Sequence, residues 1–595
     1  MVDALAHRGP DASGVREFEG GTLGHARLRI IDLSPAGDQP MTNEDGTVWV
    51  AFNGELYNFA ELRGELERGG HAFRSHTDTE VLVHLYEQHG DSLAERLRGM
   101  FAFAIWDDRL DRLLLCRDRL GIKPLYYRQV GRRLDFASEV RALASRDDAV
   151  DGAALNSYLR LGWVAGPRTI LTGVEELAAG HVLIWERGTV RTRSYWSPAS
   201  VPADRAPPSH DDLAEALTDA TARHVVADVP VGLFLSSGVD SVMVATLAQR
   251  VSPGIRAYTV SFDAGLNEGP EAAVLARRIG IDHTVVEISG ADVLGSLDRV
   301  IADMDQPTVD GVNSWVISRA VREAGMVVAL SGLGGDELFG GYSTFGHVPR
   351  LVRAGRSARL LPAWARSAPV EAAGRLARTA HWRGTRAVEA AMTGTWEAAY
   401  GSVRGLFGAR ELDAIWHLER SSSSPRLVRM PDARLEGRAM VCGLELGNYL
   451  PYQLLRDTDC MSMAHALEVR VPLLDDRVVE VAIAGQRGGG TTWTKSDLVK
   501  AVDPQFGFLA DRPKQTFTFP FDRWMRGPLR ERVLGALAGL GESGLGFDRR
   551  RLTDLWLGYQ SGTVAWRPIW ALAVLGMWLD AHADARPRPA RSGAA

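Results

Sequence analysis

Cysteine is scarce in this chain, with three residues among 595: Cys116, Cys442 and Cys460. They lie far apart in the sequence, so they form neither a metal-binding set nor a disulfide framework. A chain that does not depend on disulfides suits a reducing compartment, and we expect a cytoplasmic protein. The scarcity also leaves few candidates for any reaction that needs a thiol.

Long apolar runs and an excess of basic charge are also missing. No segment reaches the length of about 20 apolar residues that spans a membrane, and the amino-terminus lacks the charged-then-apolar pattern of a secretory signal. The net charge is −6, so there is no general electrostatic reason to expect nucleic acid. We therefore expect neither nucleic acid nor a membrane as a partner. The length exceeds what one core normally holds and predicts two domains.

Two glycine-rich loops are the most informative feature that is present. Residues 235–241 read LSSGVDS, and residues 330–342 read LSGLGGDELFGGY. Each loop follows an apolar, β-rich run, residues 229–235 and 327–330, and is therefore predicted to leave a buried parallel strand where α/β sheets bind ligands. The first loop precedes a helix that opens at residues 242–245, and small residues beside a helix amino-terminus suit pyrophosphate.

Carboxylates stand in both loops. Asp240 and Asp336 are predicted to hold the Mg²⁺ that accompanies ATP. The Gly-Lys-Ser/Thr ending of the P-loop of kinases is absent. The first loop resembles the pyrophosphatase loop of enzymes that split ATP into AMP and pyrophosphate, and the pair of loops resembles the asparagine synthetase family. The resemblance implies catalytic roles for Asp240, Asp336 and Glu337. It implies an ATP site at Leu235, Ser236, Gly238, Val239, Asp240, Ser241, Val260, Ser331 and Gly332.

The order of predicted elements divides the chain. The first third is sheet-rich, with short strands at 48–52, 101–106 and 113–116. Residues 198–209 hold four prolines and are predicted to be a linker. Strands and helices then alternate, with strands at 258–262, 284–288 and 327–330 and helices at 270–279 and 293–303, which predicts a doubly wound parallel sheet. The region from about 351 to 579 reads as mostly helical. We place the domains at 1–200 and 201–580, with a disordered tail at 581–595.

Four short motifs in the first domain resemble the glutamine-handling motifs of class II glutamine amidotransferases. They are residues 7–11 (HRGPD), 27–32 (RLRIID), 52–55 (FNGE) and 77–80 (TDTE). An arginine suits an α-carboxylate, a carboxylate suits an α-ammonium, and an amide with a backbone N–H suits an oxyanion. The resemblance implies an αββα sandwich of the Ntn-hydrolase type. Its implied glutamine-binding residues are Arg27, Asn53, Gly54, Glu55 and Asp78.

The nucleophile of that family is an amino-terminal cysteine, and this chain opens Met1-Val2-Asp3. Cys116, the first cysteine, lies in a predicted apolar strand and is interpreted as part of the core. Two explanations remain open: a start set at an internal methionine, or loss of glutamine hydrolysis. Residues 1–6 read as uncapped helix interior, which favours a missing upstream segment. Either way, we expect that the chain as written does not hydrolyse glutamine.

The resemblance extends to the carboxyl-terminal half, with two departures. Residues 512–521 (RPKQTFTFPF) resemble the family segment with a catalytic lysine, here Lys514. Residues 459–475 resemble another family segment, in which Arg470 and Asp475 are slightly favoured as structural ion pairs. Leu333 stands where asparagine-forming members usually carry Glu, and residues 457–460 (DTDC) replace Lys-x-Asp-Arg. We interpret both departures as changes on the acceptor side.

These features predict an ATP-dependent ligase with ATP and Mg²⁺ as cofactors. It would adenylate a carboxylate, aspartate by default or an acid of a specialised pathway, and form an amide with ammonia or glutamine as nitrogen source. A ring-closing enzyme of the β-lactam synthetase type is an alternative, although the Tyr–Glu pair of those enzymes is not evident in the sequence. A non-catalytic relative is a third, disfavoured by the retained catalytic set. A homodimer is the assembly that we expect.

Overall fold

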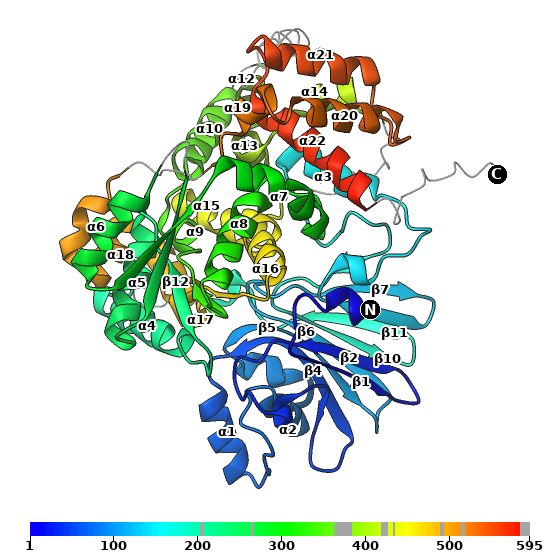
Figure 1. Ribbon diagram of the computed structural model, residues 1–595, viewed down its shortest axis with the longest axis vertical. Coiled ribbons are helices and arrows are strands. Elements are labelled where there is room, and N and C mark those ends of the chain that lie inside the picture. The colour runs from blue at the N-terminus through cyan, green and yellow to red at the C-terminus, as the bar shows by residue number, and fades with distance from the viewer. Residues whose placement is uncertain are drawn as a thin grey trace.

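The computed structural model describes residues 1–202, 207–262, 267–360, 362, 384–417, 427–431, 435–487, 493–512 and 518–582. Figure 1 shows three parts: an amino-terminal, sheet-rich domain in blue to cyan, a parallel-sheet domain mainly in green, and a group of carboxyl-terminal helices in orange and red. The predicted tail at 581–595 lies almost wholly outside the described residues, and so does part of the predicted linker.

The amino-terminal domain is built on a six-stranded antiparallel sheet with the order β11-β10-β6-β5-β4-β3. Two small sheets, β1-β2 and β8-β7-β9, accompany it. The strands are β1 (Ala12–Glu17), β2 (Thr22–Arg27), β3 (Met41–Thr42), β4 (Val48–Leu56), β5 (Gly99–Asp107), β6 (Arg112–Arg117), β7 (Tyr126–Val130), β8 (Arg133–Ala137), β9 (Glu175–Glu176), β10 (His181–Glu186) and β11 (Thr189–Ser194). The three strands predicted in this region are confirmed within β4, β5 and β6.

Alternation along the central strand β5 separates two apolar layers. Phe101 and Phe103 pack on one face with α1 (Phe59–Arg68) and α2 (Glu80–His89). Ala102 and Ala104 face the other way, into the cluster that includes Leu23 of β2 and residues of β7 and β8. Beyond this second layer, Tyr126 of β7 packs with α3 (Gly152–Leu161). Side chains in a strand alternate between faces, so one apolar strand serves both layers.

The second domain contains a five-stranded parallel sheet with the order β14-β13-β12-β15-β16. Its strands are β12 (Val231–Phe234), β13 (Arg256–Phe262), β14 (Asp282–Ile288), β15 (Val328–Leu330) and β16 (Glu468–Arg470). The helices that accompany them are α4 (His210–His224), α5 (Val239–Val251), α6 (Gly269–Ile279), α7 (Gly290–Asp303) and α8 (Gly311–Glu323). The predicted alternation of strands and helices is confirmed. The strand order reverses direction between β12 and β15, which is where such sheets bind ligands.

The rest of the chain is mainly helical, as predicted. It contains α9 (Gly335–Phe339), α10 (Thr344–Ala358), α12 (Gly384–Thr393), α13 (Trp396–Arg404), α14 (Ala409–Ile415), α15 (Gly437–Leu444), a π-helical stretch (Glu445–Leu455), α16 (Arg456–Met463), α17 (Asp476–Arg487), α18 (Lys495–Val502), α19 (Phe521–Arg526), α20 (Arg530–Glu542), α21 (Arg549–Gln560) and α22 (Trp566–Ala581). The predicted fold class, a sheet-rich Ntn-hydrolase-like domain followed by a parallel-sheet domain with a helical carboxyl-terminal part, is confirmed.

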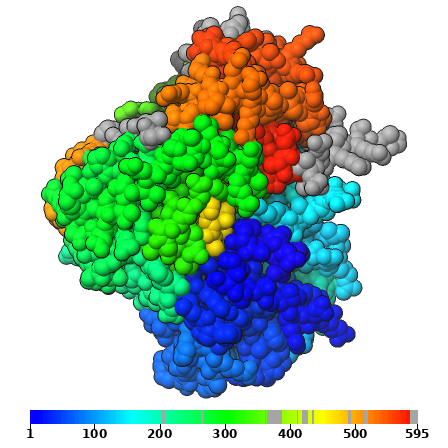
Figure 2. Space-filling model, in the orientation of Figure 1, coloured from blue at the N-terminus to red at the C-terminus, as the bar shows by residue number. Residues whose placement is uncertain are grey.

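Segments far apart in the sequence meet in the tertiary structure. Helix α3 lies beside the carboxyl-terminal helices (Figure 1), and its Tyr158 hydroxyl donates to the Ala571 carbonyl at 2.7 Å. On the face shown in Figure 2, the blue amino-terminal domain contacts the green domain directly. None of the described helices is long and apolar enough to cross a bilayer.

Candidate functional site

A cleft of the parallel-sheet domain opens at the carboxyl ends of β12 and β15. Its volume is about 840 Å³. Leu233 pairs with Leu330 in register, so the two glycine-rich loops leave the sheet side by side. Every residue of the predicted ATP site lines this cleft: Leu235, Ser236, Gly238, Val239, Asp240, Ser241, Val260, Ser331 and Gly332. Asp336 and Glu337, predicted to be catalytic, line it as well.

The first loop is held in shape by its own serines. The Ser236 backbone N–H donates to the Ser241 hydroxyl at 3.1 Å, and the Gly238 N–H donates to the Ser236 hydroxyl at 3.2 Å. Helix α5 then begins at Val239 with Gly238 as its N-cap. The first N–H groups of a helix have no partner within it, and together with the helix dipole they favour an anion at this end.

Two glycines allow the second loop to approach the first closely. A Cβ atom on Gly335 would lie 2.3 Å from Asp240 Oδ1, and one on Gly332 would lie 2.8 Å from the Ser241 backbone nitrogen. Both distances are shorter than van der Waals contact between such atoms. Side chains at these two positions would push the loops apart, so the glycines set the spacing of the carboxylates in the cleft.

Lys495 brings the two predicted metal-binding carboxylates together. Its ammonium group forms ion pairs with Asp240 and, at 3.0 Å, with Asp336. Burial lowers the pKa of Lys495, but the two carboxylates outweigh it, so the pKa is raised and the side chain stays protonated. Two carboxylate oxygens that share one cation are also close enough to share Mg²⁺, which is usually bound by one or two carboxylates plus substrate phosphates. These residues therefore fit the predicted metal.

Lys495 was not among the residues singled out from the sequence, although a local signal exists. It is the first residue of α18, directly after the N-cap Thr494, whose capping box with Asp497 marks the helix start. A cation at the positive end of a helix dipole is electrostatically unfavourable. A buried lysine at that position needs anionic partners from elsewhere in the fold, which the sequence does not identify.

Replacing Lys495 tests its part in the cleft. We expect Lys495→Met to lower the rate of ATP-dependent pyrophosphate release at saturating ATP by roughly 10²-fold, since one electrostatic stabiliser of a departing anion is removed. Lys500→Met is the matched control, because Lys500 lies on the same helix with 57% of its side chain exposed. Thermal melting monitors the fold, and Lys495→Arg retains the charge if the methionine variant unfolds. Equal rates for the Lys495 and Lys500 variants would contradict this role.

Apolar and aromatic side chains also line the cleft. Leu333 is one of them, and its role on the acceptor side stays a prediction. Helix α9 ends at Gly340 with a φ of 81°, and this turn brings Tyr342 back so that its hydroxyl donates to Glu337 at 2.6 Å. A hydrogen-bonded Tyr–Glu pair, which was not singled out from the sequence, therefore lines the cleft. The glycine turn that closes this pair is not evident from the sequence alone.

A second, smaller pocket of about 120 Å³ lies in the amino-terminal domain. All five predicted glutamine-binding residues line it: Arg27, Asn53, Gly54, Glu55 and Asp78. The Asn53 side-chain nitrogen is buried and makes no hydrogen bond, so it can donate to a bound oxygen. Gly54 has a φ of 144°, and a Cβ there would lie 2.0 Å from the Met100 carbonyl oxygen, so only glycine fits.

The charged residues of this pocket already have partners. The Arg27 guanidinium donates to Asp38 at 2.7 Å and to the Asp32 carbonyl at 2.6 Å. Glu55 accepts from Arg470 of the other domain at 2.6 Å. Burial raises the pKa of Asp78 to about 6, although the Leu56 N–H donates to this carboxyl group at 2.9 Å. The glutamine-binding roles of these side chains therefore remain predictions.

No thiol lines this pocket in the described part of the chain. Cys116 is fully buried in β6 among apolar side chains, as predicted, and burial raises the pKa of its thiol well above the usual value. Cys442 and Cys460 are also buried and free. None of the three cysteines is placed to attack a ligand in the glutamine pocket.

Buried ion pairs join the two domains. Arg8 donates to Asp459 at 2.6 Å, and Lys123 lies 3.3 Å from the same carboxylate. Arg98 pairs with Asp475 at 2.7 Å. Arg470, which is fully buried, pairs with Glu55 and Glu468, so Arg470 and Asp475 do form the structural ion pairs that were favoured.

Residues 457–460 belong to this interface, which corrects the view that they alter the acceptor side. Asp457 accepts a hydrogen bond from Thr308 at 2.5 Å, and Asp459 pairs with the amino-terminal domain. Neither lines the ATP cleft. From the sequence alone, Leu333 and residues 457–460 could not be assigned to different places. The position of α16, which carries residues 457–460, depends on contacts with a distant part of the chain.

Asp457 predicts a pH dependence of stability. Burial raises its pKa to about 7 from the usual 3.8, so its stabilising contribution is present below about pH 4 and is lost as the pH rises through about 7. The asparagine in Asp457→Asn cannot ionise. We therefore expect the melting temperature of this variant to fall less between about pH 4 and pH 7 than that of the unaltered chain. Asp554→Asn, at an exposed position on α21, is the control and should follow the unaltered chain. If the melting temperature fell equally with rising pH in Asp457→Asn and in Asp554→Asn, this expectation would be wrong.

Lys514, the predicted catalytic lysine, lies outside the described residues. Arg512, two positions earlier in the sequence, lines the cleft and forms an ion pair with Glu271. Its proposed role is unchanged by the structure.

Comparison with known proteins agrees with the two halves of this architecture. Residues 1–196 match the model of a glutamine amidotransferase domain, and residues 212–580 match the model named asparagine synthase. The chain belongs to the asparagine synthase family. It is 29% identical over 551 residues to asparagine synthetase [glutamine-hydrolyzing] 1 of Bacillus subtilis, covering 90% of this chain and 85% of that protein. It is 32% identical to a putative asparagine synthetase of Mycobacterium bovis, covering 88% of this chain and 84% of that one.

Not every relative in the asparagine synthase family carries that name. The amidase chry2 of Gibberella zeae is 32% identical over 375 residues, covering 58% of this chain and 55% of that protein. Membership of the asparagine synthase family confirms the predicted class, a carbon–nitrogen ligase, and supports ATP-dependent amide formation in general.

Proposed function

We propose that this chain adenylates a carboxylate with ATP and converts the acyl-adenylate to an amide with ammonia, releasing pyrophosphate and AMP. The observation that carries the proposal is the meeting of Asp240, Asp336 and Lys495 at the carboxyl edge of the parallel sheet. The two carboxylates and the ammonium group face one cleft together with every residue of the predicted nucleotide site.

The side chains suit the two steps of this reaction. In the first, a carboxylate oxygen bonds to the α-phosphorus of ATP while the bond from that phosphorus to the bridging oxygen breaks. Lys495 and the first N–H groups of α5 are placed to stabilise the pyrophosphate that leaves. Mg²⁺, which Asp240 and Asp336 would hold, neutralises phosphate charge when bound. In the second step the nitrogen of ammonia bonds to the acyl carbon, the bond to AMP breaks, and a proton leaves the nitrogen.

For the acyl substrate we propose a monocarboxylic acid with an apolar body, in place of aspartate, the default from the sequence. Apolar and aromatic residues that line the cleft include Ile317, Leu333, Tyr342, Tyr449 and Leu454, and Asp310 and Glu337 are acids of the same lining. The two basic residues described in the lining are already paired, Lys495 with Asp240 and Asp336 and Arg512 with Glu271. Arg404 lies behind the rings of Tyr342 and Tyr449 and donates to Glu445 at 2.7 Å. A second substrate carboxylate would therefore meet like charge and apolar surfaces.

A panel of acids tests both parts of the proposal. With ATP, Mg²⁺ and ammonium, we expect apolar monocarboxylates to support faster pyrophosphate release than aspartate at equal concentration, with an amide as product. Aspartate as the best acid would refute the substrate assignment and leave the ligase reaction standing. Pyrophosphate release by no acid of the panel would contradict the adenylation step.

Ring closure is a second candidate, because Tyr342 and Glu337 form a hydrogen-bonded pair in the cleft. Enzymes of the β-lactam synthetase type, as stated above, use such a pair. In that case the amine belongs to the substrate itself, and product forms from ATP and an amino acid without added ammonium. Dependence on ammonium therefore separates the two reactions. The cytoplasmic location and the homodimer stay predictions.

A further inference from the structure

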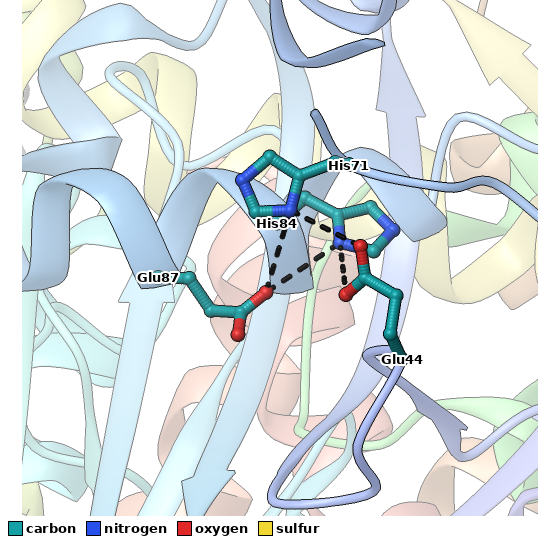
Figure 3. Close-up of side chains that lie close together, drawn as sticks. All are labelled: Glu44, His71, His84 and Glu87. Carbon is teal, nitrogen blue, oxygen red and sulfur yellow. Dashed lines mark hydrogen bonds and ion pairs between the residues drawn. The ribbon is translucent and has the colours of Figure 1, made fainter. Parts of the chain in front are cut away.

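Two histidines and two glutamates converge in the amino-terminal domain, away from both pockets. They are Glu44, His71, His84 and Glu87, and one donor atom from each lies within 4.8 Å of all the others. Figure 3 shows that the four side chains point toward one another, two from one helix and the others from outside it. Glu44 lies in the turn between β3 and β4, His71 follows α1, and His84 and Glu87 are neighbours on one face of α2.

The spacing of the donor atoms is that of ligands around one ion. His84 Nδ1 lies 3.1 Å from a Glu44 oxygen and 3.5 Å from Glu87 Oε2, and His71 Nδ1 lies 3.2 and 3.7 Å from oxygens of the same two carboxylates. In tetrahedral zinc sites the ligand nitrogens and oxygens lie about 2.0–2.2 Å from the metal, which separates neighbouring ligands by roughly 3.4 Å. The four measured separations bracket this value.

Buried donor atoms in the cluster are left without hydrogen bonds. The side chain of His84 is 1% exposed, and neither of its ring nitrogens makes a hydrogen bond of acceptable geometry, despite the nearby carboxylates. Glu87 Oε2 is likewise buried without one. Buried polar atoms are rarely left unsatisfied, so each such atom needs an explanation. His71 Nδ1 does make a hydrogen bond, with Glu44 at 3.2 Å. The unpartnered atoms are those of His84 and Glu87, and a shared metal ion would satisfy His84 Nδ1 and Glu87 Oε2.

Neighbouring groups hold the ligands in this orientation. Asn43 Nδ2 donates to Glu87 Oε1 at 2.9 Å, which leaves Oε2 facing the cluster, and the Ala72 N–H donates to Glu44 at 3.0 Å. On the other side of the His84 ring, Nε2 lies 3.7 Å from the Glu80 carboxylate. This distance is too long for a hydrogen bond, so the Glu80 carboxylate acts on the imidazole through its charge alone.

We infer that Glu44, His71, His84 and Glu87 form a structural site for Zn²⁺. Two neutral imidazoles and two carboxylates carry a charge of −2, which one divalent ion neutralises. Imidazole donors favour zinc over Mg²⁺ and Ca²⁺, which prefer oxygen ligands alone. Four protein ligands fill a tetrahedral zinc ion, so the site has a structural role with no open position for catalysis.

The site would tie the β3–β4 turn and the segment after α1 to helix α2. Asp78, which lines the glutamine pocket, lies two residues before α2 begins. Zinc bound here would therefore restrain the segment that carries one wall of that pocket. The inference does not depend on the proposed ligase reaction, because none of the four ligands lines the ATP cleft.

Metal analysis of the full chain tests the site. After chelation and removal of the chelator, titration with Zn²⁺ in excess Mg²⁺ should show one zinc bound per chain and a melting temperature raised by several degrees. We expect His71→Ala and Glu87→Gln each to weaken binding at least tenfold and to remove the shift in melting temperature. Glu87→Gln keeps an oxygen that can accept from Asn43, so the local fold should survive.

Two further variants serve as controls. His76→Ala removes an exposed histidine from the same segment and should bind zinc like the unaltered chain. Asp240→Asn should also retain zinc, which excludes the ATP cleft as the place where it binds. Failure of the unaltered chain to bind zinc, or equal binding by His71→Ala and His76→Ala, would overturn the assignment and leave a proton-sharing network of histidines and glutamates.

Discussion

Replacement of Asp240 by alanine is expected to abolish pyrophosphate release from ATP while leaving the fold intact. Asp240 faces the cleft from the first turn of α5 and pairs with Lys495. Its removal takes away a proposed Mg²⁺ ligand, and losing an electrostatic stabiliser of this kind costs about 3 kcal/mol of barrier or more, a loss of roughly 10²-fold or greater. For stability, an aspartate near a helix amino-terminus contributes only about 0.3–1 kcal/mol.

Pyrophosphate release at saturating ATP and Mg²⁺, together with thermal melting, measures both parts of this expectation. Asp282→Ala is the matched control, since Asp282 is exposed on the edge strand β14 of the same sheet. If Asp240→Asn needs a higher Mg²⁺ concentration than the unaltered chain for half-maximal pyrophosphate release, the substitution has weakened Mg²⁺ binding. Unchanged pyrophosphate release in Asp240→Ala would refute the metal assignment.

The 595-residue chain is expected to use ammonium and to leave glutamine intact. The glutamine pocket presents an unsatisfied Asn53 amide for an oxyanion, but no cysteine lines it among the described residues. Burial raises the pKa of the Cys116 thiol well above the usual value and that of Cys442 to about 12, so neither supplies a thiolate near neutral pH. We expect no glutamine hydrolysis at all, as opposed to a reduced rate, because the covalent step of that reaction needs a nucleophile.

Glutamate release from glutamine, with and without ATP, checks this directly, and ammonium-dependent amide formation is the positive control. Should the codons before Met1 encode Met-Cys-Gly-Ile, extending the chain through them is expected to switch glutamine use on. Glutamate release by the 595-residue chain itself would mean that another nucleophile is at work.

Much of the architecture could be predicted from local patterns. The strands before the two glycine loops were predicted to within a few residues, because buried parallel strands read as short β-branched runs bounded by glycine. Helices α8 and α9, which flank the second loop, were not predicted. The residues predicted to bind the nucleotide do lie together in one cleft, since parallel strands end at one edge of the sheet.

The residues that were missed or misplaced depend on distant partners. Lys495 reaches Asp240 across 255 positions of sequence, and Asp459 meets Arg8 across the domain interface. The pairing of Tyr342 with Glu337 depends on a turn at Gly340. Each is an ordinary residue in its own segment, and no local pattern indicates which partner it meets.

By itself the sequence determined the alternation of strands and helices, the two glycine loops and the family resemblance. These are properties of short segments, where periodicity, chain geometry and residue type decide the outcome. Only the tertiary structure decided which charges meet: Lys495 between two carboxylates, Arg470 against Glu55, and the two histidines and two glutamates of the zinc site. Burial makes such charges costly unless they are paired, and the partners are chosen by how whole layers pack, which no single segment specifies.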